Sequence, residues 1–167
     1  MRRFPVVWRV VPVLLVLVVA GCGSSKHAAT TPASPASVLG AGAQVLYAGG
    51  GWAVVTRGND AVAAHLVNGA WQPDRSGVVK VSVLGPPKRT GSIPQAAAEI
   101  TGPSHLVEEG LWIDGKELLE KGGGLTPEKV TVYGAPDKKL APGRHVLIAY
   151  GRTEGHATAV LYPFTVV

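Results

Sequence analysis

The sequence predicts an all-β fold, an antiparallel β-sandwich preceded by a β-meander. Short segments rich in β-branched and aromatic residues alternate with turns at intervals of about 8–12 residues, a spacing typical of sandwiches and barrels. The Asn68-Gly69 pair, between two apolar segments, is the strongest hairpin signal in the chain. No stretch after residue 22 keeps a helical hydrophobic period over about 11 residues. We therefore expect one folded domain over residues 39–167.

The first part of this domain, residues 39–86, is predicted to form the meander. Its strand candidates are rich in valine, alanine and aromatic residues, which favour strands. They are residues 44–47, 52–57, 61–67, a return strand through Trp71, and 78–84. In the last of these, Val79, Val81 and Val83 share one face, which predicts a strand with one buried side.

The second part, residues 87–167, is predicted to hold the remaining strands. They are residues 95–100, 111–116, 130–133, 144–152 and 158–167. Residues 116–121 are predicted to form one helical turn that stops at the glycines 122–124, and residues 126–128 a further short turn. The last two strands predict a hairpin joined by residues 153–157. Pro163 cannot donate a hydrogen bond to a ladder, which predicts an edge position or a bulge there.

Three motifs in this second part carry a family resemblance. They read Trp112-Ile113-Asp114-Gly115-Lys116, then Leu140-Ala141-Pro142-Gly143-Arg144-His145-Val146, then Phe164-Thr165-Val166. Together they resemble bacterial immunoglobulin-like domains, which carry "hydrophobic-D-G-K", "L-x-P-G-x-H" and a closing "F-x-V". The resemblance implies an immunoglobulin-like sandwich over residues 87–167, with Phe164 filling the core between two sheets. It implies a fold and no single function.

The N-terminus has the features of an export signal. Arg2, Arg3 and Arg9 precede an apolar run that ends in small residues before Cys22, the only cysteine. The run from residue 10 to residue 20 is too short for a spanning helix, which needs about 20 residues. Val19-Ala20-Gly21-Cys22 is similar to the lipobox of bacterial lipoproteins. That resemblance implies a signal peptide over 1–21, acyl chains on Cys22, a flexible tether over 22–38 and a location on the extracytoplasmic face of the cell membrane.

Charge and cysteine content exclude several classes of protein. The formal net charge is +5, but three of the 16 basic residues lie in the signal, leaving 13 against 11 acidic residues. No basic run remains, so no nucleic-acid partner is predicted. With Cys22 at the anchor, the domain has no cysteine for a disulfide or for a cysteine-based zinc site.

One turn offers a candidate metal site. Glu154-Gly155-His156 is similar to the "D-G-H" near the end of periplasmic copper-resistance domains, which implies copper binding through Glu154 and His156. Here glutamate replaces the aspartate and no histidine begins the mature chain, so an ordinary hairpin turn is the favoured prediction. Trp52, Trp71 and Trp112 are predicted to be core residues rather than a ligand-binding face.

The function predicted from the sequence is non-enzymatic, with no cofactor. We expect a membrane-anchored module for binding or envelope architecture, with a protein or a cell-envelope polymer as partner besides the membrane itself. Periplasmic copper binding at the Glu154-Gly155-His156 turn is the alternative. A third class, an enzyme whose site is assembled from scattered residues, stays open at this stage.

Overall fold

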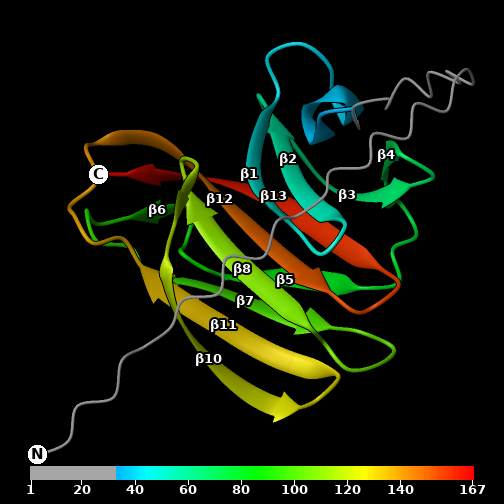
Figure 1. Cartoon of the computed structure of the whole chain (residues 1–167). Coiled ribbons are helices and arrows are strands. Elements are labelled where there is room, and N and C mark those ends of the chain that lie inside the picture. The colour runs from blue at the N-terminus through cyan, green and yellow to red at the C-terminus, as the bar shows by residue number, and fades with distance from the viewer. Residues whose placement is uncertain (1–32) are drawn as a thin grey trace, which may run out of the picture. The chain divides into compact units, whose positions relative to one another are not determined.

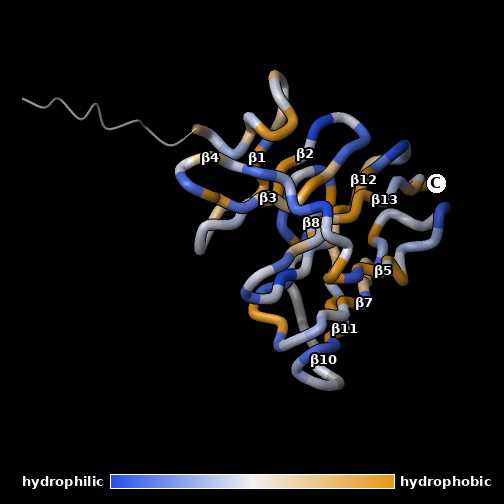
Figure 2. Tube along the Cα trace, turned by 90° about the vertical axis from the view of Figure 1, so that its right-hand side faces the viewer, coloured by the Kyte–Doolittle hydropathy of each residue, from blue (hydrophilic) through white to orange (hydrophobic). Residues whose placement is uncertain are grey.

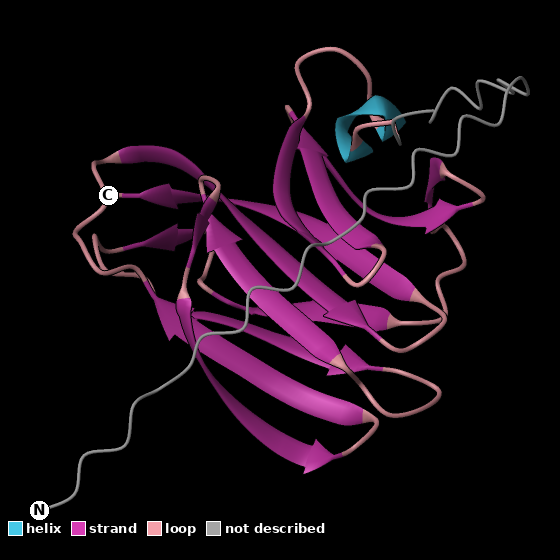
Figure 3. Ribbon diagram, viewed as in Figure 1, coloured by secondary structure: helices cyan, strands magenta, loops and turns pink. Residues whose placement is uncertain are grey.

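The structure is a computed structural model that describes residues 33–167, without the side chains of residues 119–122 and 125. The predicted signal peptide (1–21), Cys22 and most of the predicted tether lie outside this part. Within residues 33–167 the fold is all-β, apart from one short 3-10 helix (Figure 3). None of the helices in this range is long and apolar enough to cross a membrane.

Thirteen strands follow the short helix η1 (Pro35–Val38) within the described range. They are β1 (Gln44–Gly49), β2 (Trp52–Arg57), β3 (Asp60–Val67), β4 (Ala70–Pro73), β5 (Lys80–Gly85), β6 (Arg89–Thr90), β7 (Ala96–Thr101), β8 (Glu108–Ile113), β9 (Lys116–Glu117), β10 (Leu119–Thr126), β11 (Lys129–Ala135), β12 (Gly143–Arg152) and β13 (Ala157–Val166). They form three sheets, which we call the meander sheet, the central sheet and the outer sheet.

The meander sheet has the order β1-β2-β3-β4, with every neighbouring pair antiparallel. Its last hairpin turns at Asn68 and Gly69, whose φ angles are 50° and 80°. Positive φ at both central residues is the type I′ geometry that asparagine and glycine favour. The predicted hairpin is confirmed.

The other two sheets form the predicted sandwich. The central sheet has the order β6-β13-β12-β8-β9, and the outer sheet the order β10-β11-β7-β5. The strand predicted at 78–84 is β5. It pairs with β7 in the outer sheet, so the boundary between meander and sandwich lies before β5 and not at residue 86.

The central sheet lies between the other two (Figure 1). Along β12, Leu147 and Ala149 pack in the core shared with the outer sheet, whereas Ile148 and Tyr150 pack in the core shared with the meander sheet. Successive side chains of a strand point to opposite faces, so a strand covered on both sides needs an unbroken apolar run. Figure 2 shows such hydrophobic stretches along β2 and β12.

The predicted core residues are found in these layers. Phe164 is 2% exposed and lies in the core between the central and outer sheets, as the resemblance implies. Trp52 and Trp112 are buried between the meander sheet and the central sheet. Trp71 packs against a third, smaller core on the far face of the meander sheet. The prediction that the three tryptophans serve the core is confirmed.

The end of the predicted tether is folded onto the meander. Ser34 caps η1 by accepting a hydrogen bond from the Ala36 N–H at 3.3 Å. Val38 and Leu39 then pack against the buried face formed by Ala53 and Val55. The last residues of the predicted tether, from Ser34 to Val38, therefore belong to the folded domain.

The helical turn predicted at 116–121 is wrong. Asp114 and Gly115 form a second type I′ turn, with φ angles of 50° and 78°, and the chain returns as β9 beside β8. It then continues as β10, which pairs with β11 from Leu119↔Ala135 to Thr126↔Lys129. One turn of helix offers few hydrogen bonds, so pairing with a neighbouring strand outweighs a weak helix preference.

Pro163 occupies an edge-like position in β13. It lies opposite Val146, whose N–H and C=O both bond to Asp114 on the far side of β12. The proline nitrogen therefore points away from β12, and β6 pairs with β13 only from Thr165 onward. The pairing with β12 shows no register shift here, so the position is an edge without a bulge.

Candidate functional site

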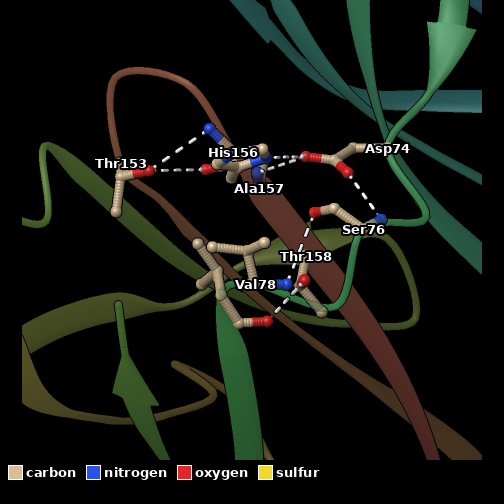
Figure 4. A network of polar contacts seen from close by, with 8 residues as sticks. Asp74, Ser76, Val78, Thr153, His156, Ala157 and Thr158 are labelled. Atoms are coloured by element: carbon tan, nitrogen blue, oxygen red, sulfur yellow. Dashed lines mark hydrogen bonds and ion pairs between the residues drawn. The ribbon is translucent and has the colours of Figure 1, made fainter. Parts of the chain in front are cut away.

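The Glu154-Gly155-His156 turn is held by hydrogen bonds within the hairpin and to a distant loop (Figure 4). Thr153 donates its backbone N–H to the His156 carbonyl at 2.8 Å, and its Oγ1 accepts from the His156 N–H at 3.2 Å. His156 Nδ1 faces Asp74 Oδ2 at 3.6 Å. Glu154 is exposed and makes no ion pair in the described part of the chain.

Asp74 ties this turn to the end of the meander. Its side chain is only 6% exposed, and its two oxygens accept from the backbone N–H groups of Ala157 and Ser76, both at 2.8 Å. Burial alone raises the pKa of Asp74, but these donors outweigh it and hold the pKa below its ordinary value. The carboxylate is thus a structural acceptor and its oxygens are already occupied.

The predicted metal candidates do not converge. Across residues 33–167, no three histidine, cysteine, aspartate or glutamate side chains come together as a set that could hold a metal ion. His156 and Asp74 make a pair, and Glu154 is apart from both.

A second cluster of polar side chains lies between the meander sheet and the central sheet. Arg152 donates from Nε to Glu108 Oε2 at 3.0 Å, and its guanidinium lies 6.0 Å from the ring centre of Trp52. Hydrogen bonding to Glu108 and then burial raise the pKa of Tyr47. The Tyr150 hydroxyl is buried without a hydrogen-bond partner, and burial raises its pKa. These groups fasten β1 and β2 to the central sheet.

The two longest motifs of the family resemblance meet at His145. Its Nδ1 lies 2.6 Å from Asp114 Oδ2, and its Nε2 lies 2.8 Å from the Ala141 carbonyl oxygen. Both neighbours are acceptors, so both ring nitrogens must donate, which requires the imidazolium form. The hydrogen bond to Asp114 raises the pKa of His145, burial opposes it, and the Ala141 carbonyl adds to the rise. The ring also stacks on Phe164, with centroids 5.6 Å apart.

A candidate site for a ligand lies on the face of the central sheet that the meander leaves open. One hollow, of about 210 Å³, lies between the start of β1, the end of β2 and the Asp114-Gly115 turn, and Val146 and Ile148 also line it. A second, of about 340 Å³, is lined by residues of β12, β13 and the β6 segment. Val146 lines the first hollow, and its cross-strand partner Pro163 lines the second. We call them together the central-sheet groove.

The chemistry of the groove is set by cations. Its basic residues are Arg57, Lys88, Arg89 and Arg144, and all are exposed. Asp114 is the single carboxylate among the residues lining the two hollows. Its Oδ2 faces the His145 imidazolium and its Oδ1 accepts from the Val146 N–H at 3.0 Å, so its charge is already compensated.

Sequence reasoning missed this groove because its residues are scattered. Lys88 and Arg89 are adjacent, but Arg144 follows 55 positions after Arg89 and meets it only through strand pairing. A search for basic runs therefore finds nothing. The sequence contains one indirect signal for the groove. The Pro-Gly-Arg-His motif places Arg144 at the start of a long predicted strand.

The sequence matches no protein-family model, and a search of curated proteins found no match.

Proposed function

We propose that this chain is an exported, lipid-anchored and non-enzymatic binding module of the immunoglobulin-like type, with its ligand in the central-sheet groove. The observation that carries the proposal is the groove itself, two hollows on the central sheet that are lined by four exposed cations. Its polar side chains favour binding over catalysis. Asp114 is engaged by His145, and Arg57 Nη1 donates to the Leu39 carbonyl at 2.8 Å.

The immunoglobulin-like part of the proposal is supported by strand order. In immunoglobulin domains one sheet has the order A-B-E-D and the other contains C, F and G. Taking β5 as strand A, the outer sheet reads β5-β7-β11-β10, in which the chain order is first, second, fourth and third. The central sheet places β13, β12 and β8 side by side, as G, F and C would lie. The meander is then an addition that covers part of the G-F-C face.

The anchored part of the proposal is supported by the Val19-Ala20-Gly21-Cys22 sequence after three arginines. Stable anchoring needs about two acyl chains, since each buried CH₂ contributes about 0.8 kcal/mol. We expect Cys22→Ser to abolish acylation and to leave an unprocessed precursor. Mass spectrometry of the mature N-terminus measures both. An unmodified Cys22, or cleavage at another bond, would contradict the anchor.

The binding part is tested by site-specific photo-crosslinking in the cell's own membranes. A photoreactive residue at Thr165, which lines the second hollow, should capture a ligand. The matched control is Thr131, the cross-strand partner of Glu99 in the outer sheet. Adducts at Thr165 and none at Thr131 are the expected result. Equal labelling at the two positions, or none at Thr165, would show that the groove is not the binding site.

A further inference from the structure

We propose that the central-sheet groove binds a linear polyanion, a flexible chain that carries phosphate groups at intervals. This inference rests on the proposed binding function and names the chemical class of its ligand. It follows from four cations that have no acidic partner, from the arrangement of two of them on either side of Thr165, from the position of Lys88, and from the shape of the site.

The first observation is the absence of ion pairs. Among the residues that the structure describes, Arg57, Lys88, Arg89 and Arg144 make no contact with a carboxylate within 4.0 Å. Elsewhere in the fold, cations do find partners, as Lys129 does with Glu99 at 2.8 Å. Overall charge does not explain the cluster, because basic and acidic residues are nearly balanced after Cys22.

The second observation is how strand pairing gathers the charges. Thr165 pairs with Arg89 of β6 on one side and with Arg144 of β12 on the other. Directly paired residues point to the same face, and neighbouring strands are about 4.8 Å apart. The Cα atoms of Arg89 and Arg144 are therefore about 10 Å apart, and the two side chains leave the sheet on one face. An anion between them would contact both guanidinium groups.

The third observation is the position of Lys88. Its Nζ donates to the Pro163 carbonyl oxygen at 3.2 Å and lies 3.7 Å from the ring centroid of Tyr162. Tyr162 points to the opposite face of β13 from Thr165, so the ammonium group lies at the edge of β13 beside the second hollow, and neither partner cancels its charge. The side chain is thus pre-positioned at low entropic cost to meet a phosphate.

The shape of the site selects the kind of anion. The cations line two hollows, the first with Arg57 at the meander and the second with Lys88, Arg89 and Arg144 beside β6. A membrane of anionic headgroups would meet only the rim of such a groove. A single phosphate would engage only part of the set. A chain with repeated phosphates can lie along the groove and reach all four residues.

The experiment measures binding of long-chain inorganic polyphosphate to the full chain in phosphatidylcholine liposomes by co-sedimentation. The variant Lys88→Gln/Arg144→Gln removes one lysine and one arginine from the groove. Arg75→Gln/Lys80→Gln removes the same charges from exposed positions that line neither hollow. Arg89→Gln is a second groove variant, which keeps the Lys88 contact to Pro163. Circular dichroism confirms that each variant is folded.

We expect about tenfold weaker polyphosphate binding for the groove double variant. The slope of its salt dependence should fall by about one unit for each cation removed from the groove. The control variant should bind like the wild type, and orthophosphate should compete poorly.

Equal weakening in the groove and control variants would overturn the proposal, as would tight binding of orthophosphate. Displacement of polyphosphate by liposomes that contain phosphatidylglycerol would assign the groove to lipid headgroups instead. If crosslinking at Thr165 succeeds and polyphosphate does not bind, the ligand class is wrong and the binding function stands.

Discussion

At the residue scale, single polar side chains join segments that are far apart in the sequence. Asp114 and His145 link the turn after β8 to the start of β12, and Asp74 links the end of the meander to the start of β13. The sequence motifs contain Asp114 and His145, but they do not show that the two side chains are in contact. In the structure, His145 donates to Asp114 and to the Ala141 carbonyl oxygen, and these two hydrogen bonds hold the segment that leads into β12. Asp74 had no motif and could not be found from sequence, because its partners are backbone N–H groups.

The pH dependence of stability should report on His145. Its pKa is raised above the ordinary 6.5 in the folded protein, so the folded state binds the proton more tightly than the unfolded state. This stabilisation is fully present below the unfolded pKa and is lost as the pH rises through the folded pKa. We expect His145→Gln to lower the free energy of unfolding by about 2 kcal/mol at acidic pH and by less at alkaline pH.

Urea unfolding of the chain after Cys22, followed across that pH range, provides the measurement. His105→Gln is the control, because His105 is exposed in the loop before β8. The same destabilisation by His145→Gln at every pH would contradict the imidazolium assignment.

At the element scale, the turns were predictable and the edge strand was not. Asn68-Gly69 and Asp114-Gly115 adopt positive φ angles that these residue types favour, so local sequence determines both hairpins. Residues 95–100 were correctly predicted as a strand despite three alanines. The strand β10 was missed because its glycine run has no side-chain pattern to reveal it. Its conformation comes from pairing with β11, which is a tertiary effect.

Gly151 in β12 tests how closely the central and outer sheets pack. A Cβ added there would collide with the side chain of Ile100, which is fully buried in β7. Overpacking of this kind costs about 2 kcal/mol, so Gly151→Ala should lower the free energy of unfolding by that amount. Gly155→Ala is the matched control, since a Cβ at Gly155 meets nothing within 4 Å. Thermal and urea unfolding of the two variants should differ clearly. Equal stabilities would mean that the sheets can move apart to admit a methyl group.

At the scale of the whole molecule, the sequence predicted the sandwich and the meander but not their stacking. Along β12, Val146, Ile148 and Tyr150 share one face, which by itself indicates only one buried side. In the structure the alternate residues Leu147 and Ala149 are also buried, because the sheet is covered on both sides. Which sheet covers which face depends on contacts between segments about 100 residues apart, and a single sequence does not display them.

The stacking predicts that the sandwich depends on the meander. Removing residues 33–73 would uncover the apolar side chains that the meander sheet now covers, Trp112, Ile148 and Tyr150 among them. Exposed apolar patches of this kind promote association. We expect the shortened chain to bind the dye ANS and to leave a sizing column as aggregates, whereas the chain from residue 33 elutes as a monomer. A well-folded monomeric sandwich without the meander would contradict this dependence.

The central sheet packs against both other sheets, and its position also determines the order in which parts of the chain can fold. Trp52 of β2 packs in the same core as Tyr150 of β12, so the first strands to leave the ribosome must wait for nearly the whole chain before their partner layer exists. Contacts this distant in sequence form slowly, because a long loop must close before they do. The last hairpin, β12 and β13, supplies that layer to both neighbours at once. A chain that stops before residue 143 therefore holds only β6, β8 and β9 of the central sheet, and the two neighbouring sheets lack the surface that β12 and β13 give them.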